Sequence, residues 1–273
     1  MRLAMIQQMC SKDRKANREK GIEAVKKAAD QGAQIICFPE LSFEPFYPQI
    51  SDPSYAFQFT EPIPGPTTDQ FSEIAVKYKL VIVLNLFEKD GEKTYDTSPV
   101  INIEGNILGK TRMVHVPNYP GFHESKYYHP GNYGAPVYST RYGKIGVAIC
   151  YDRHYPEYLR ALAKKAADIV LVPQAGVVDE WPAGLYEAEM RVAAFQNGFY
   201  TGLCNRVGKE QYLNFAGESF VCDPFGHVVA RAKKQQEDIL VYECNTKHLN
   251  KCPARKLFLP DSRPELYTQW LQK

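Results

Sequence analysis

The chain has 273 residues, of which 44% are hydrophobic and 23% charged, a composition ordinary for a globular protein with a sizeable core. Its formal net charge of only +2 gives no electrostatic basis for binding nucleic acid or an anionic membrane. No run approaches the roughly 18 apolar residues of a transmembrane helix. The seven cysteines include no CxxC pair, which favours reduced thiols in a cytoplasmic protein over zinc ligands.

Short buried strands alternate with helices along the chain. Residues 1–6 predict a first core strand rather than a signal peptide. The hydrophobic pattern then predicts a helix at 13–31, a strand at 35–38, a helix at 66–79 and strands at 80–87, 96–103 and 107–116. After a long loop at 117–135, it predicts strands at 136–141 and 144–150, a helix at 155–166, a strand at 168–173, a helix at 183–197 and strands at 199–205, 216–222, 227–232 and 238–244.

Two segments of the chain are similar to each other. Residues 33–40 and 167–174 each follow an amphipathic helix, and each ends in a proline and a polar residue, Glu40 or Gln174. The similarity indicates two halves built alike, which two sheets packed face to face with helices outside would satisfy. We expect one domain over residues 1–273, with a polar tail at 246–273 that has an aromatic end.

Cys150 is the strongest candidate for a functional residue. It ends an apolar run that begins at Ile145, and polar residues follow at once. A strand that turns directly into a helix presents its last side chain, together with free backbone N–H groups, to a substrate. The alternative is a plain buried cysteine in a strand, a common fate for free thiols.

A thiol nucleophile needs a base, and Glu40 is the best candidate. It ends a buried strand, follows Pro39 and precedes an aromatic loop that contains Phe43 and Phe46. Such surroundings raise the pKa of a carboxyl group, which suits proton transfer near neutral pH. The alternative for Glu40 is a loop carboxylate or a partner of a helix cap.

Three blocks of sequence resemble the signature blocks of the nitrilase superfamily of carbon–nitrogen hydrolases. They are Phe38-Pro39-Glu40-Leu41, then Gly109-Lys110-Thr111-Arg112 with His115-Val116-Pro117, and Gly146-Val147-Ala148-Ile149-Cys150-Tyr151-Asp152. Further matches are Asn205-Arg206-Val207-Gly208, Gly217-Glu218-Ser219-Phe220 and Asp223-Pro224-Phe225-Gly226. The tail segment 263–267 is similar to the branches that contain N-carbamoylputrescine amidohydrolase and beta-ureidopropionase.

The resemblance implies an α/β fold, a four-layer α-β-β-α sandwich that usually pairs into a homodimer or a higher homo-oligomer. It implies hydrolysis of a small non-peptide amide or N-carbamoyl compound, without a metal or an organic cofactor. By position, Cys150 becomes the nucleophile, Glu40 the general base and Glu124 the supporting glutamate. Without the resemblance, Glu124 would be taken for an exposed loop carboxylate.

One catalytic position departs from the family pattern. The family has Arg-Lys-x-His where this chain has Arg112-Met113-Val114-His115, so Met113 replaces the catalytic lysine. Lys110 and Arg112 lie at odd offsets from Met113 and should face the other side of a strand. Loss of one oxyanion donor typically costs about 2.7–4 kcal/mol in the barrier. A nitrile hydrolase and a weakly active binding or regulatory protein therefore stay open as alternatives.

Four further residues are weaker candidates for substrate binding. The Tyr151 backbone N–H follows the nucleophile and could hold the oxyanion. Arg153 could bind a substrate carboxylate, although an arginine at a helix start often forms a salt bridge. Trp181 could line a pocket, although buried aromatic residues are more often plain core. Glu187 lies on the helix at 183–197, where the family has charged residues near its pocket.

Overall fold

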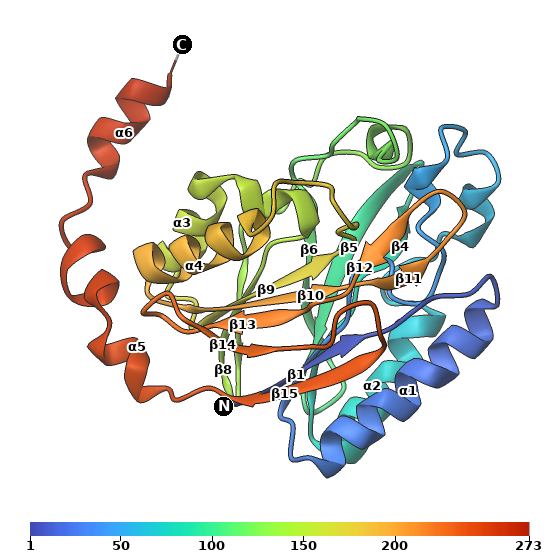
Figure 1. Ribbon diagram of the computed structural model, residues 1–273, viewed down its shortest axis with the longest axis horizontal. Helices are drawn as coiled ribbons and strands as arrows, with labels where there is room; N and C mark the ends of the chain where they lie inside the picture. Colours follow the sequence, from blue (N-terminus) through green and yellow to red (C-terminus); the bar gives the residue numbers. More distant parts are fainter. Residues whose placement is uncertain (273) are drawn as a thin grey trace.

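The computed structural model describes residues 1–272, and two β-sheets packed face to face form its centre (Figure 1). The first sheet contains β1 (Arg2–Gln7), β2 (Ile35–Cys37), β3 (Val81–Val83), β4 (Leu86–Asp90), β5 (Lys93–Ile101), β6 (Ile107–Arg112) and β15 (Asp238–Glu243). The second contains β7 (Val137–Thr140), β8 (Gly143–Val147), β9 (Ile169–Gln174), β10 (Tyr200–Asn205), β13 (Phe220–Cys222) and β14 (Val228–Arg231). A separate two-stranded ribbon joins β11 (Val207–Lys209) to β12 (Asn214–Ala216).

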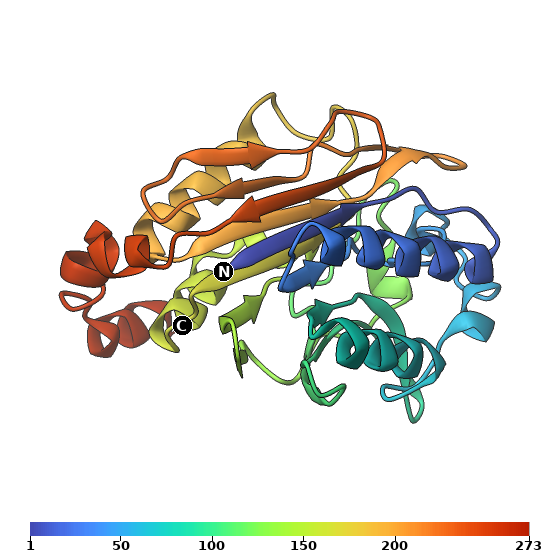
Figure 2. The same cartoon turned by 90° about the horizontal axis from the view of Figure 1, so that it is seen from below.

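Helices cover the outer face of each sheet. On the first sheet, α1 (Arg14–Asp30) and α2 (Pro66–Tyr78) bury Val25 and Phe71 in one apolar cluster with residues of β1, β2 and β3. On the second sheet, α3 (Pro156–Lys164) and α4 (Leu185–Asn197) bury Leu162 and Met190 against β9 and β10. Figures 1 and 2 show the two helix pairs on opposite sides of the sheets. The predicted α-β-β-α sandwich is thus confirmed.

The two halves are built alike, as the sequence predicts. β2 lies parallel between β1 and β3, and β9 lies parallel between β8 and β10. Alternate side chains of each central strand point to opposite faces. Ile35 and Ile169 enter the core between the sheets, whereas Ile36 and Val170 pack under the helices. Burial on both faces explains why these strands are continuously apolar.

Two predicted strands are each divided in the structure. The strand expected at 80–87 becomes β3 and β4, because Asn85 between them turns its side chain to other polar groups instead of continuing the ladder. The strand expected at 216–222 becomes β12 and β13, because Gly217 and Glu218 adopt φ angles of +68° and +54°. Strands expected at 107–116 and 144–150 end earlier, at Arg112 and Val147.

The predicted polar tail is largely helical. It contains α5 (Lys247–Lys251), a π-helical turn (Ala254–Phe258) and α6 (Pro264–Leu271), and α6 extends away from the sandwich in Figure 1. Leu257, Trp270 and Leu271 are more than half exposed on this arm. Within residues 1–272, no helix has the length and apolar character needed to cross a membrane.

A buried ion pair fixes the orientation of β6. The Arg112 guanidinium donates to both carboxylate oxygens of Glu88 at 2.8 Å, and Lys110 also pairs with Glu88. Arg112 and Lys110 thus share one side of the strand, as their even spacing predicts. The next residue, Met113, belongs to the apolar core between the sheets and is 1% exposed.

Replacing Glu88 with Gln should lower the free energy of unfolding by about 3–5 kcal/mol, because the buried Arg112 would lose its main counter-charge. Asp90→Asn is the matched control. Asp90 accepts from the same guanidinium at 2.6 Å, but its side chain is 55% exposed. Its loss should therefore lower the free energy of unfolding far less. Urea denaturation measures the free energy of unfolding of both variants. Equal losses would show that Glu88 is not the main counter-charge of Arg112.

Candidate active site

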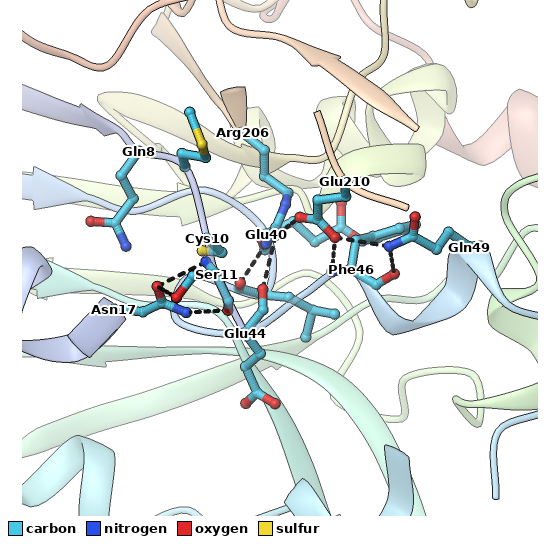
Figure 3. Close-up of polar contacts among 12 residues, drawn as sticks. Gln8, Cys10, Ser11, Asn17, Glu40, Glu44, Phe46, Gln49, Arg206 and Glu210 are labelled. Atoms are coloured by element: carbon cyan, nitrogen blue, oxygen red, sulfur yellow. Dashed lines mark hydrogen bonds and ion pairs between the residues drawn. The ribbon is translucent and has the colours of Figure 1, made fainter. Parts of the chain in front are cut away.

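Glu40 lies in a turn that a buried arginine holds in place. The turn follows β2, and the Glu40 side chain is fully buried. Arg206, which follows β10 in the other sheet, donates to the backbone carbonyls of Glu40 at 2.8 Å, Leu41 at 2.5 Å and Glu44 at 2.8 Å (Figure 3). Glu210 pairs with the same guanidinium. Arg206 therefore connects the Glu40 turn to the second sheet.

Cys150 lies at the sharp bend that the sequence predicts, but a 3₁₀ helix separates it from α3. It is the first residue of η4 (Cys150–His154), and its φ of +43° is unusual for a residue with a side chain. Such backbone strain is concentrated at functional sites. The Ala175 backbone N–H interacts with the sulfur and favours the thiolate. The side chain is 5% exposed.

Glu124 comes from the long loop between β6 and β7. It is the first residue of the short 3₁₀ helix η3 (Glu124–Lys126), and it is fully buried. Its backbone carbonyl accepts from the N–H groups of Tyr127 and Tyr128, at 2.8 and 2.9 Å. The aromatic loop thus folds inward and delivers a carboxyl group to the centre of the molecule.

The structure brings these three predicted residues together. The Cys150 sulfur and one carboxyl oxygen each of Glu40 and Glu124 all lie within 4.8 Å of one another. A thiolate and two carboxylates are also potential metal ligands, and among residues 1–272 they form the one such group of three. The same geometry places a nucleophile beside an acid–base group.

Burial dominates the electrostatics of the site. Desolvation, with a smaller contribution from the nearby Glu124, raises the pKa of Glu40 to about 8, although the Cys150 thiol and Asp96 act in the opposite direction. The thiol and the protonated Asp96 favour the ionised form of Glu40 because each can donate a hydrogen bond toward its carboxylate. Desolvation also raises the pKa of Glu124 and of the Cys150 thiol.

Asp96 is a fourth ionisable residue at the site, and our sequence analysis missed it. It lies on β5 and is 1% exposed, and its Oδ1 accepts from the Asn85 side chain. Desolvation raises its pKa well above the usual range, and Glu40 raises it further. A carboxyl group inside an otherwise buried strand was the available signal, because buried acids are rare without a function or a partner.

Met113 places no charge at the site. Its backbone N–H donates to the Asp96 carbonyl at 3.0 Å, so it lies beside the acidic residues, and its side chain is part of the same apolar cluster as Cys150. Lys110 and Arg112 are turned away to Glu88. Within the described chain, no lysine or arginine forms an ion pair with Glu40, Asp96 or Glu124.

The four weaker candidates lie around the three central residues. Arg153 is buried, stacks 4.5 Å from the Tyr186 ring, and forms an ion pair with Glu189 at 3.3 Å. Its Nη1 also donates to the Cys150 carbonyl at 3.3 Å. The Tyr151 ring packs edge-on to His154, as does that of Trp181. Glu187 pairs with Arg231 and, at 3.5 Å, with Arg191.

A cavity of about 360 Å³ lies on the Trp181 side of the site. Trp181 and Glu187 line it, together with Glu180 and Tyr186, while Cys150 does not. Tyr186 connects the two regions, because it lines the cavity and also interacts electrostatically with Cys150. Tyr186 also stacks on Arg153, which donates to the Cys150 carbonyl, so this wall of the cavity is linked to the segment that carries the thiol.

Comparisons with known proteins agree with this geometry. The carbon-nitrogen hydrolase family matches residues 2–254. The chain is 32% identical to N-carbamoylputrescine amidase of Solanum lycopersicum, over 97% of this chain and 93% of that protein. Carbon-nitrogen hydrolase from Helicobacter pylori G27 has a similar structure, with a TM-score of 0.91 and 26% identity over 100% of this chain and 99% of that one.

A mutant of the amidase from Nesterenkonia sp. AN1 is also similar, with a TM-score of 0.84 and 26% identity over 99% of this chain and 97% of that one. It carries the acetamide moiety of fluoroacetamide, covalently added at its active-site cysteine. With the sandwich fold and the family match over nearly the whole sequence, these findings show that the chain belongs to the carbon–nitrogen hydrolase family of the nitrilase superfamily.

Proposed function

We propose that this carbon–nitrogen hydrolase cleaves a small amide or N-carbamoyl compound, with Cys150 as the nucleophile and Glu40 as the general base. The observation that carries the proposal is the approach of the Cys150 sulfur to carboxyl oxygens of Glu40 and Glu124 within 4.8 Å, at the centre of the fold. The name of the similar Solanum lycopersicum enzyme supports the N-carbamoyl class.

The reaction proceeds through a covalent intermediate. Glu40 accepts the Cys150 proton, and the sulfur attacks the carbonyl carbon. The C–N bond breaks as Glu40 passes the proton to the leaving ammonia or amine, which leaves a thioester, or a thiocarbamate from a carbamoyl compound. Water, deprotonated by Glu40, then breaks the C–S bond and releases the acid and the free thiol.

The remaining groups stabilise charge around this step. Backbone N–H groups are suited to hold the oxyanion, and those of Tyr151 and Ala175 are the candidates. The Ala175 N–H already favours negative charge on the sulfur. Glu124 raises the pKa of Glu40, which strengthens Glu40 as a base.

Met113 keeps a second candidate function open, a weakly active binding or regulatory protein on the same scaffold. The acidic site has no lysine to stabilise an oxyanion, and that favours weak turnover of neutral amides. Nitriles form a third group of substrates to test. Acyl-adduct formation on Cys150 separates an enzyme, in which the adduct turns over, from a binding protein.

The cellular location and the oligomeric state of the enzyme are also predictions. We expect a cytoplasmic homodimer or higher homo-oligomer in which the tail, residues 246–273, packs on a partner subunit. The exposed Leu257, Trp270 and Leu271 of the described tail support this expectation, because contiguous apolar surface is commonly covered by a partner. Sedimentation of the whole chain and of a Trp270→Ser variant would measure the assembly.

Cys150→Ala should abolish ammonia release and the acyl adduct that intact-mass spectrometry detects on the wild-type protein. Cys222→Ala is the matched control, because Cys222 is another fully buried free thiol but lies in β13 under α4. It should keep the adduct and most of the rate. Turnover by Cys150→Ala at the wild-type rate would rule out the proposed nucleophile.

Glu40→Gln should slow acylation of Cys150 by about 10²–10⁴-fold, the usual contribution of a general base. Because the pKa of Glu40 lies at about 8, the wild-type rate should rise with pH up to about that value as the carboxylate forms. The variant should lack this rise. A pH profile of single-turnover acylation measures it, and an unchanged profile in the variant would assign the proton transfer to another group.

Glu40→Gln should also change the pH dependence of stability. Between the ordinary pKa of 4.5 and about 8, the folded protein keeps a Glu40 proton that the unfolded chain has lost. The free energy of unfolding therefore falls as pH rises over this window, by about 1.4 kcal/mol per pH unit for one such group. Urea denaturation should find a shallower fall in the variant, and identical slopes would contradict the raised pKa.

A further inference from the structure

The active site holds more hydrogen-bond acceptors than its protein surroundings satisfy. Both carboxyl oxygens of Glu40, both of Glu124 and Oδ2 of Asp96 are buried without a hydrogen-bond partner among the described residues. Buried polar atoms are nearly always paired, so each exception in a native fold calls for a ligand or a function. Tyr128 adds a buried hydroxyl without a partner, and it interacts electrostatically with the same three carboxyls.

The nearby cations form their ion pairs with other residues, although the charge of Arg153 favours the Cys150 thiolate and that of Arg206 favours ionised Glu40. The Arg206 guanidinium binds backbone carbonyls and Glu210, and Arg153 stacks on Tyr186 and pairs with Glu189. Lys110 and Arg112 pair with Glu88. Met113, adjacent to Asp96, contributes only an apolar side chain. The acid–thiol cluster, which we define as Glu40, Asp96, Glu124 and Cys150, therefore holds buried carboxyl oxygens with which no lysine or arginine of the described chain pairs.

We propose that the acid–thiol cluster takes a substrate whose reacting group is itself a cation, an amidinium or a guanidinium. This inference rests on the proposed hydrolase function and specifies its substrate class. A planar amidinium carries N–H donors that match carboxylate oxygens in bidentate pairs. Carboxyls of Glu40 and Glu124 lie beside the sulfur, Asp96 of β5 lies next to Glu40, and together they can hold such a group at its edges.

The charge balance of the reaction favours a cationic substrate at this site. Thiolate attack on a neutral amide creates an oxyanion, which needs a neighbouring positive charge. Attack on an amidinium carbon instead joins a negative sulfur to a positive carbon centre, and the tetrahedral adduct is neutral. Position 113 can therefore hold an apolar residue without loss of rate, and a lysine at this position would repel the cationic substrate.

The steps balance without an oxidant, a reductant or a further co-reactant. The C–S bond forms as the C=N electron pair moves to nitrogen, and Glu40 transfers the thiol proton to that nitrogen. Ammonia leaves as the C–N bond breaks, which gives a cationic thioimidate, or an isothiouronium from a guanidinium. Water then adds, and the C–S bond breaks to release an amide, or a urea from a guanidinium, and the thiol. Overall, an amidinium and water give an amide and ammonium.

The cavity beside the site suits the rest of such a molecule. It has a volume of about 360 Å³, which is enough for a small substituent, and Trp181 and Tyr186 provide aromatic walls. Glu180, which accepts from Tyr119 at 2.7 Å and pairs with Tyr186, adds a further acidic group there. Arg231 and Lys234 also line the cavity, and each forms an ion pair with a glutamate, Glu187 or Glu218, so their positive charges are compensated.

The experiment uses the full-length protein in the presence of a chelator and compares substrates in pairs of the same shape, one cationic and one neutral. Acetamidine is compared with acetamide and methylguanidine with methylurea, by ammonia release and by mass of the Cys150 adduct. The wild type should prefer the cationic member of each pair by roughly tenfold or more in kcat/KM, as expected when a site has unpaired charged acceptors. Preference for the neutral members would overturn the proposal, whether or not any variant folds.

Met113→Lys should invert the preference, because the new ammonium would occupy the carboxylates and repel the amidinium. Acetamide turnover should rise and acetamidine turnover fall, each by about 10²-fold. Lys110→Met is the matched control, since Lys110 faces Glu88 instead, and its acetamidine-to-acetamide ratio should equal that of the wild type. An unchanged ratio in folded Met113→Lys protein would contradict the inference.

The outcomes also separate this inference from the proposed function. Adduct formation and turnover with acetamide but not with acetamidine would refute the cationic substrate and leave the cysteine hydrolase intact. Turnover of neither compound class, and no adduct on Cys150, would refute both. Stoichiometric zinc binding that Cys150→Ala abolishes, with no amidine turnover, would show that the cluster holds a metal and would overturn the proposal.

Discussion

The site depends on one guanidinium that crosses between the two sheets. Arg206 leaves the end of β10 and binds three backbone carbonyls in the turn after β2. Carbonyls at the end of a strand need donors, and the burial of this turn excludes water as the source. Because Arg206 satisfies them, Glu40 can stay in a fixed place opposite the segment that carries Cys150. The distance between base and nucleophile is thus set by the packing of the sheets.

The same packing accounts for what the sequence could predict. Strands such as β9 are apolar from Ile169 to Pro173, and helices such as α2 bury apolar residues on one face, so the order and the layers of the sandwich followed from the hydrophobic pattern. Glu40, Glu124 and Cys150 were named from motifs, and the structure brings them together. Glu124 depended on the resemblance alone, because nothing local indicates that the 117–135 loop turns inward.

The sequence could not predict contacts that depend on long-range packing. The break at Asn85 and its contact with Asp96 arise where the β2 turn meets β5, and no neighbour in sequence signals that contact. Arg153 matches both alternatives that the sequence left open, a salt bridge and a place at the site, because it is ion-paired to Glu189 and also contacts the Cys150 carbonyl.

Buried carboxyl groups reduce the stability of a fold. This fold tolerates three of them near a strained cysteine, which is typical of sites where function has been favoured over stability.

Asn85 links two parts of the site through one amide group. Its carbonyl oxygen accepts from the Leu41 N–H at 2.7 Å, and its amide nitrogen donates to Asp96 and, at 3.1 Å, to Ser98. The two ends face opposite kinds of partner, so the amide can be oriented in one way only. An aspartate at position 85 would oppose Asp96, and an aliphatic residue would leave both partners unpaired. Positions 85 and 96 therefore form a coupled pair, and evolutionary change at one should be accompanied by change at the other.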